Sequence, residues 1–331
     1  MSLYRWLFLL LMLLSLPGSA QSYIAYQHTF NRVDDDILSG HPEQSRARLD
    51  SIYNGYSFIY AKHCFKALQI MCSLNDSARA GQWLSRCFIQ GIPLWAIRTN
   101  ELTRKSLTYG TATYPLQHYD SLKQVYRSRI NTTLQAEIAR LLAIDYRYTR
   151  RVNNGFFLFR HTLYGLQWKR NNAKEFKKLV ALIDQYGYPG EQMIGLPVSI
   201  ADSTGSARFA LSGGGFGLEL QNREVLFMLL HYYSNPRPDI NKKLIPYIDK
   251  GILPADHYGR INDYLAQFGK GRYGEYLPYY VHHDRPGNSR DDTDERRQAI
   301  GLNHYDAQQR NRAIIRERLR QRTINKEIIP E

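Results

Sequence analysis

Cysteine is scarce in this chain of 331 residues, which has only Cys64, Cys72 and Cys87. None of them has the Cys-x-x-Cys spacing of a zinc site or of a thiol redox motif, so the sequence excludes both classes. A Gly-x-Ser-x-Gly nucleophile elbow is also missing. The glycines Gly213-Gly214-Gly215 lack the Gly-Lys-Ser/Thr ending of a phosphate-binding loop. We therefore expect no metal, no cofactor and no standard nucleophile.

Long apolar runs are missing after the first twenty residues. Those residues combine a positive start over Met1–Arg5, an apolar run over Trp6–Leu16 and the small residues Gly18-Ser19-Ala20. This is the pattern of a signal peptide over residues 1–20 that is cleaved after Ala20. No later segment reaches the ~18 consecutive apolar residues that a membrane-spanning helix needs. The sequence predicts an exported protein, periplasmic or extracellular, with no transmembrane segment after cleavage.

Acidic residues are few relative to basic ones. The chain has 30 Asp and Glu against 44 Lys and Arg, and its formal net charge is +14. In the cytoplasm this charge would favour nucleic acid as the partner. Outside it, anionic lipid, cell-surface polysaccharide or an acidic protein are the candidates, and the alternative is that dispersed basic side chains only solvate the surface. We expect a protein or peptide partner and no nucleic acid.

The first half of the chain has helical patterns. Tyr56–Leu74 is continuous, apolar and free of glycine and proline. Asn75-Asp76 then supplies a turn and an N-cap for a helix over Ser77–Gln90, which Gly91 ends. The stretch Ala67–Ile92 resembles one tetratricopeptide unit. We predict a tetratricopeptide-like helical region over residues 21–131.

This helical hairpin would place Cys64 and Cys87 almost opposite each other. Cys64 lies eleven residues before Asn75, and Cys87 lies twelve residues after it. Cys64 and Cys87 are therefore the candidate disulfide in an oxidising compartment. The alternative is that both are small packing residues, because spacing alone does not show the close approach that a disulfide needs.

The rest of the chain also favours helices. Leu116–Ile130 and Leu134–Val152 fit a second antiparallel pair. The aromatic stretch Phe156–Trp168 fits either a short helix or a strand, and Ser199–Gly217 is typical of a flexible insertion. Further helices are expected over Ala173–Tyr186, Asn222–Tyr233, Asp239–Lys250, Pro254–Phe268, Asp292–Ile300 and His304–Thr323.

Five motifs follow one another in the second half, after a lead-in helix with Asp145-x-Arg147. They are "LIDQYGYPGEQMIG" (Leu182–Gly195), "LFMLLHYYSNP" (Leu226–Pro236), "KKLIPYIDKGILPADHYGRINDYL" (Lys242–Leu265), "GKGRYGEYL" (Gly269–Leu277) and "DTDERRQAIGL" (Asp292–Leu302). In this order they resemble a bacterial domain of unknown function, number 6624, which implies an α-helical domain over residues 132–302 with a small β-hairpin near Tyr273-Gly274. The expected fold class is mainly α, with the helical-hairpin region followed by this domain.

The resemblance also implies a cluster of polar side chains. Its members are His231, Asp263, Tyr273, Asp294, Arg296 and Arg297. His231 beside Asp263 would form an acid–base pair, because a carboxylate orients an imidazole and raises its basicity. The alternative is a structural ion pair in which Asp263 binds Arg296 or Arg297 and holds the hairpin to the helices.

Two stretches near the end of the sequence invite other interpretations. His282-His283-Asp284 does not predict a metal site, because adjacent residues seldom point at one ion. Residues 303–331 are predicted to form a basic C-terminal helix, with six arginines against one glutamate over Arg310–Arg322. This helix would either make a weak contact with an anionic membrane surface or pack on the preceding domain.

Two functions remain open. The first is an exported interaction or scaffold module of the cell envelope, whose helical hairpin offers a groove to a protein or peptide. The second is a hydrolytic enzyme that uses His231 and Asp263. Tyr264 and Tyr276 stand where the family has an arginine and a glutamine, and this difference favours the first function.

Overall fold

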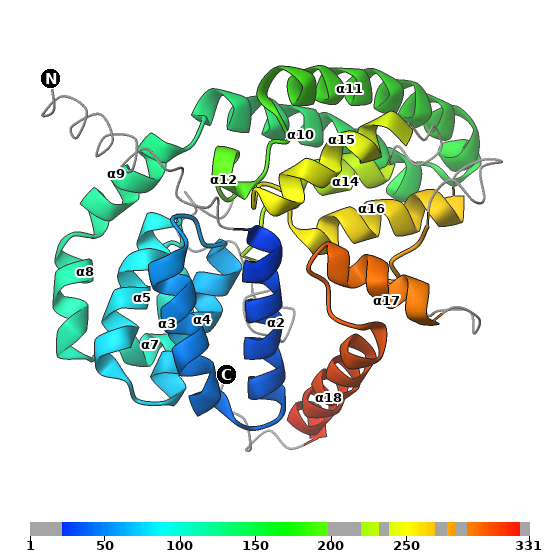
Figure 1. The fold of residues 1–331 in the computed structure, drawn as a ribbon. Coiled ribbons are helices and arrows are strands. Elements are labelled where there is room, and N and C mark those ends of the chain that lie inside the picture. The colour runs from blue at the N-terminus through cyan, green and yellow to red at the C-terminus, as the bar shows by residue number, and fades with distance from the viewer. Residues whose placement is uncertain (1–21, 198–219, 232–237, 269–276, 282–289, 325–331) are drawn as a thin grey trace, which may run out of the picture.

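All regular structure that the computed structural model describes is helical (Figure 1). The described residues are 22–197, 220–231, 238–268, 277–281 and 290–324, so the predicted signal peptide and the predicted insertion lie outside them. The mainly α prediction is confirmed. The predicted β-hairpin is not found, since no strand occurs in these ranges, and Tyr273-Gly274 lies outside them. The segment that follows, residues 277–281, donates backbone amides to a side chain on a helix instead of to a neighbouring strand.

The first group of helices encloses one hydrophobic core, in which Phe65, Leu68 and Trp83 are buried. This core also takes Leu196 and Leu220 from later in the chain. The helices of this group are α2 (Tyr23–Leu38), α3 (Ser45–Gly55), α4 (Ala61–Ser73), α5 (Ser77–Ile89), α6 (Leu94–Thr99), α7 (Glu101–Ser106), α8 (Thr113–Gln117) and α9 (Tyr119–Arg129).

Helices α4 and α5 form the predicted helical hairpin. Asn75 takes a left-handed conformation in the turn, and the Asp76 carboxylate caps α5 by accepting the backbone amide of Arg79 at 3.2 Å. Gly91, at φ +82°, lies just after the end of α5. Helix α4 begins five residues later than predicted, because residues 56–60 form an extended stretch whose apolar side chains are buried in the core.

The predicted antiparallel pair of Leu116–Ile130 with Leu134–Val152 is wrong. The first segment is α8 and α9, and α9 packs on α5. Helix α10 (Thr132–Asn154) packs instead on α11 (Gly165–Tyr186) and α14 (Glu224–His231). The reason lies in the buried residues: α10 turns a row of apolar side chains into a second core, whereas α9 buries only a tyrosine.

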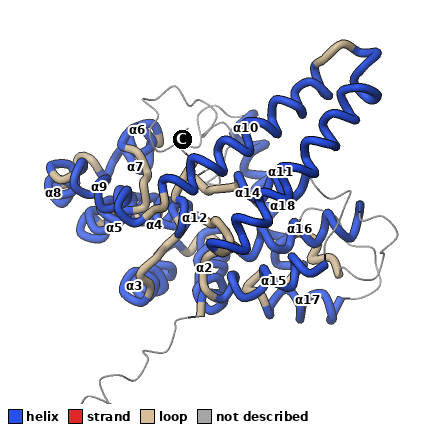
Figure 2. The backbone as a smooth tube through the Cα atoms, turned by 90° about the horizontal axis from the view of Figure 1, so that it is seen from above, coloured by secondary structure: helices blue, strands red, loops and turns tan. Residues whose placement is uncertain are grey.

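The aromatic stretch Phe156–Trp168 is helical, which settles the choice that the sequence left open. It consists of a 3-10 turn over Phe157–Phe159, a π-helical turn over Arg160–Tyr164 and the start of α11. Helix α11 therefore begins eight residues before the predicted Ala173. Seen from above, the far ends of α10 and α11 project from the rest of the molecule (Figure 2).

The second core draws its side chains from Leu134 to Leu302. Besides α10, α11 and α14, it is built by α12 (Glu191–Ile194), α15 (Pro238–Asp249), α16 (Ala255–Phe268) and the residues between α17 (Arg290–Ala299) and α18 (Tyr305–Ile324). The bounds of α15 to α18 agree with the predicted ranges to within two residues. Of the residues described, no helix has the length and apolar character needed to cross a membrane.

Helix α2 joins the two groups. Asn31 donates to the carbonyl of Gly301 at 2.9 Å, and the His28 ring contacts the carbonyl of Gln298 at 3.0 Å. Asn311 of α18 donates to the Asp35 carboxylate at 2.7 Å. The first long helix is thus packed against segments that lie about 270 residues later in the sequence.

Candidate functional site

His231, the last residue of α14, is paired with a carboxylate that differs from the predicted one. Its Nδ1 lies 2.5 Å from Oδ2 of Asp145 on α10. The Asp145 side chain is buried and also accepts the amide of Asn172 at 2.8 Å, and the Trp168 ring packs edge-on against the His231 ring. The His231 side chain remains about a quarter exposed. Asp145 therefore fixes the orientation of an imidazole that solvent can still reach.

Asp263, the predicted partner, binds backbone instead. Its carboxylate accepts the amides of Tyr279, Tyr280 and Val281 at 2.6 to 2.9 Å. Arg297 of α17, whose side chain is 1% exposed, donates to the carbonyl of Tyr279 from the other side. Both groups hold the same short segment against α16 and α17. Their geometry is that of a structural clamp.

The remaining predicted residues lie around this clamp. Asp294 accepts the backbone amide of Tyr305, the first residue of α18, at 2.7 Å. Arg296 contacts the carbonyl of Pro278 at 3.4 Å. Tyr273 and the His282-His283-Asp284 stretch lie outside the described residues. Within the described ranges no group of histidines, cysteines and carboxylates could hold a metal ion.

The cysteines are buried free thiols in the structure. Cys64 and Cys87 lie on the facing helices α4 and α5, and burial raises the pKa of both thiols above the ordinary value. Such thiols stay protonated and react slowly. The candidate disulfide between Cys64 and Cys87 is not formed here and stays a prediction.

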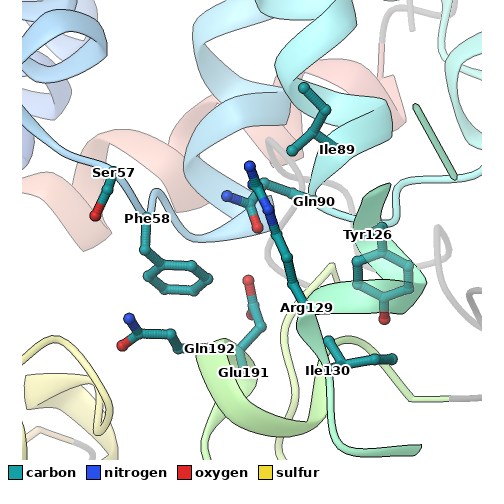
Figure 3. Close-up of a pocket in the computed structure, with 9 residues that line it drawn as sticks. All are labelled: Ser57, Phe58, Ile89, Gln90, Tyr126, Arg129, Ile130, Glu191 and Gln192. Atoms are coloured by element: carbon teal, nitrogen blue, oxygen red, sulfur yellow. The ribbon is translucent and has the colours of Figure 1, made fainter. Parts of the chain in front are cut away.

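A pocket of about 360 Å³ lies where the first group of helices meets α12 (Figure 3). It opens between the stretch before α4, the end of α5 and the end of α9. The lining residues are Ser57, Phe58, Ile89, Gln90, Tyr126, Arg129, Ile130, Glu191 and Gln192. Phe58, Gln90, Tyr126 and Glu191 are buried in its wall, while Ser57, Arg129 and Gln192 are exposed at the mouth.

Glu191 places a buried carboxylate in this pocket. Its side chain points toward Gln90, with Phe58 on one side and Arg129 on the other (Figure 3). Oε1 accepts the backbone amide of Ala61, the first residue of α4, at 2.6 Å, while Oε2 is buried without a hydrogen-bond partner among the described atoms. Burial raises the pKa of Glu191 to about 7, against the lowering effects of the Ala61 amide, Lys62 and the Asn222 amide. Near neutral pH this group can gain or lose a proton.

Two glycines position the tyrosine of the pocket wall. Tyr126 of α9 lies between Gly91 and Gly195, and a Cβ atom at either glycine would come within 2.5 Å of the tyrosine. Its hydroxyl accepts the backbone amide of Leu196 at 2.9 Å. Both glycines have positive φ, so the turns after α5 and α12 can approach the ring closely. Tyr126 thus fixes α9 to the turn that follows Glu191.

A layer of charged and polar groups lies beside Glu191, between α4 and α16. Lys62 is 3.6 Å and Arg260 is 3.8 Å from the Asp256 carboxylate. Burial alone would raise the pKa of Asp256, but the positive charges of Lys62 and Arg260 hold it well below its usual value. Burial lowers the pKa of His257 to about 3, so the ring is neutral and its Nε2 accepts the amide of Gln221 at 2.8 Å. Paired charges therefore fill this part of the junction.

Sequence reasoning missed Glu191 as a site residue. It was noticed only as part of the Leu182–Gly195 motif, where it follows the turn Tyr188-Pro189-Gly190. An acidic residue at the first position of a helix is ordinarily explained by the helix dipole. Its burial depends on α4, which lies 130 residues earlier in the sequence.

Comparison of the chain with protein-family models, with curated proteins and with solved structures found no match. The resemblance to the domain of unknown function and the likeness to a tetratricopeptide unit therefore stay predictions.

Proposed function

We propose that this protein is an exported binding module of the cell envelope whose pocket takes a cationic group of a protein or peptide partner. The observation that carries this proposal is Glu191, a buried carboxylate in the wall of a pocket of about 360 Å³, whose Oε2 has no hydrogen bond of good geometry although the Asn222 amide is near enough to lower the pKa of the group. Burying a carboxylate without pairing it is unfavourable, and a ligand ammonium or guanidinium would supply the missing donors. Two helix groups meet here, and ligand sites are common at such junctions.

The pocket dimensions and lining fit a side chain or a chain end. Its volume is at the lower end of the ~300–1,000 Å³ typical of ligand sites. The Phe58 and Ile89 side chains provide apolar surface for the carbon atoms of a lysine. Gln90 and the exposed Arg129 offer donors to a backbone carbonyl or a carboxylate on the same peptide. A short peptide with a lysine would satisfy each of these groups.

The test is calorimetric titration of the mature protein with short lysine-containing peptides and with the same peptides acetylated on the lysine. We expect the lysine forms to bind, and to bind more tightly as the pH rises through the Glu191 pKa of about 7, because the carboxylate then carries its charge. Glu191→Gln should weaken binding on the order of tenfold and abolish this pH dependence. Glu43→Gln, at an exposed position, is the matched control. Equal binding of lysine and acetyl-lysine peptides would contradict the proposal.

A hydrolytic enzyme is the second candidate, and the His231–Asp145 contact favours it. A histidine oriented by a buried carboxylate and open to solvent can act as a general base. The acid–base pair of this enzyme hypothesis is now His231 with Asp145 and not His231 with Asp263, because the Asp263 carboxylate accepts hydrogen bonds from three backbone amides.

This candidate predicts that His231→Gln abolishes, and Asp145→Asn lowers at least tenfold, the turnover of one member of a panel of ester and amide substrates. Both variants should keep the helical circular dichroism of the parent. Absence of turnover by the parent protein on the whole panel, or turnover that both variants retain, would remove the enzyme hypothesis.

A further inference from the structure

The α10–α11 hairpin projects from the rest of the molecule (Figure 2). The residues at its turn have exposed large apolar side chains. Their exposed fractions range from 44% for Phe159 to 66% for Phe157. The six residues are Phe156, Phe157, Leu158, Phe159, Leu163 and Leu166, and we call them the apolar tip. Exposed apolar side chains gathered in one turn are typical of a site of interaction with another protein or with a membrane.

Contacts within the turn hold the apolar tip in shape. The Phe156 ring lies 5.1 Å from the Phe157 ring and 5.6 Å from the Phe159 ring, measured between centroids. Arg160 donates from Nε to the carbonyl of Gly155 at 2.7 Å and closes the turn. The rings are thus presented together at one end of the hairpin, before any partner binds.

Basic residues surround the tip on both helices, and acidic residues are absent from the same stretch. Residues 146–174 contain no Asp or Glu. Their basic residues are Arg147, Arg150, Arg151, Arg160, Lys169, Arg170 and Lys174, and all except Arg160 are exposed. We call these seven residues the basic collar. An α-helix rises 1.5 Å per residue, so Arg150 and Arg151 lie roughly 6–9 Å behind Phe156.

We infer that the α10–α11 hairpin docks on an anionic lipid bilayer, with the apolar tip in the headgroup layer and the basic collar against the phosphates. Aromatic rings favour this layer, and interfacial segments bury apolar groups about 5–10 Å deep, which matches the distance from the tip to the collar. A hydrophobic groove on a protein would also accept the rings. It would not, however, require seven basic and no acidic residues spread over both helices, which is what a uniformly negative surface favours.

Vesicle flotation of the mature protein tests this inference. We expect binding to vesicles of phosphatidylethanolamine with phosphatidylglycerol, and little binding to vesicles of phosphatidylcholine alone. Phe156→Ser/Phe157→Ser should lower the partition coefficient at least tenfold, because it removes the buried apolar area. Arg150→Glu/Arg151→Glu should lower it by a similar factor and remove most of the salt dependence. The control is Tyr114→Ser/Ile245→Ser, which changes two exposed apolar residues on α8 and α15 and should bind as the parent does.

A second measurement, the fluorescence of an introduced tryptophan, reports how deeply the apolar tip enters the bilayer. It remains informative if the serine variant unfolds. The variant Phe157→Trp should shift its tryptophan fluorescence to shorter wavelength on anionic vesicles, whereas Tyr114→Trp should show no such shift. The inference is wrong if the parent does not bind anionic vesicles, if it binds phosphatidylcholine equally well, or if tip and control variants bind alike. It is also wrong if binding survives in the tip variants and is lost in Arg310→Glu/Arg318→Glu, because the basic C-terminal helix would then be the contact.

Discussion

Glu191 is a carboxyl group whose protonation is coupled to folding. Its pKa is about 7 in the folded protein and 4.5 in the absence of burial, so the folded state binds more protons than the unfolded state between these values. The free energy of unfolding must therefore fall as the pH rises through this window. Glu224, with a pKa that burial also raises to about 7, acts in the same direction.

We predict that Glu191→Gln removes one part of this pH dependence. Between pH 4.5 and pH 8 the parent should lose on the order of 3 kcal/mol of stability that the variant keeps, since each pKa unit corresponds to about 1.4 kcal/mol. Urea unfolding of both proteins across this pH range measures the difference. The contribution of Glu224 to the pH dependence cancels, because Glu224 is present in both proteins. Parallel curves for parent and variant would show that Glu191 is not buried as a lone carboxyl group.

Sequence reasoning identified some important residues without their partners. His231 and Asp263 were both singled out, and both make short hydrogen bonds in the structure. The partner of His231, however, is set by the packing of α10 on α14, across 86 residues of chain. Asp263 binds amides of a segment whose conformation no local pattern specifies. A motif shows that a polar group is needed, whereas the tertiary contacts decide which atoms it binds.

At the scale of elements, the glycine after α12 is a critical position. Gly195 and Gly40 both have positive φ, at +68° and +82°. A Cβ atom at Gly195 would lie 2.1 Å from the Tyr126 hydroxyl, but one at Gly40 would meet nothing within 4 Å. The positive φ makes an alanine unfavourable at both positions, and Gly195 adds a ψ of −162°, which residues other than glycine rarely adopt with positive φ, and the collision with Tyr126.

Gly195→Ala should therefore destabilise the protein by about 1–3 kcal/mol more than Gly40→Ala does, the usual cost of forcing a buried side chain aside. Chemical denaturation of the two variants measures this difference directly. Similar losses in both would mean that Tyr126 moves without cost and is not the rigid wall of the pocket. The peptide titration applied to Gly195→Ala then shows whether displacing Tyr126 also closes the pocket.

Helix ends were predicted well where a local signal decides them. Asp76 caps α5 and Gly91 follows its end. The start of α11 was missed because Asn172, a residue typical of N-caps, lies inside the helix and uses its amide on Asp145. The aromatic stretch before it was ambiguous since its apolar residues are exposed, and periodicity predicts structure only where one face is buried.

For the whole molecule, the sequence predicted a helical protein with a hairpin in its first half. It did not predict how the helices are arranged between the two cores, and it paired the segment of α9 with that of α10 because they are adjacent in the chain. The pocket is a property of this arrangement. Glu191, Gln90 and Arg129 come from three elements, and nothing local in any of them indicates that the three meet.

The packing of α2 against residues near α17 and α18 has a consequence for the order of folding. Contacts such as Asn31 with Gly301 and Asn311 with Asp35 close loops of 270 and 276 residues. Contacts of such long range form late and slow the approach to the native state. A ribosome moves at about 5–20 residues per second, so α2 waits roughly 14 to 54 seconds before these partners have been synthesised. For that interval the polar face of α2, which carries His28, Asn31 and Asp35, lacks these partners, and the first core holds the helix.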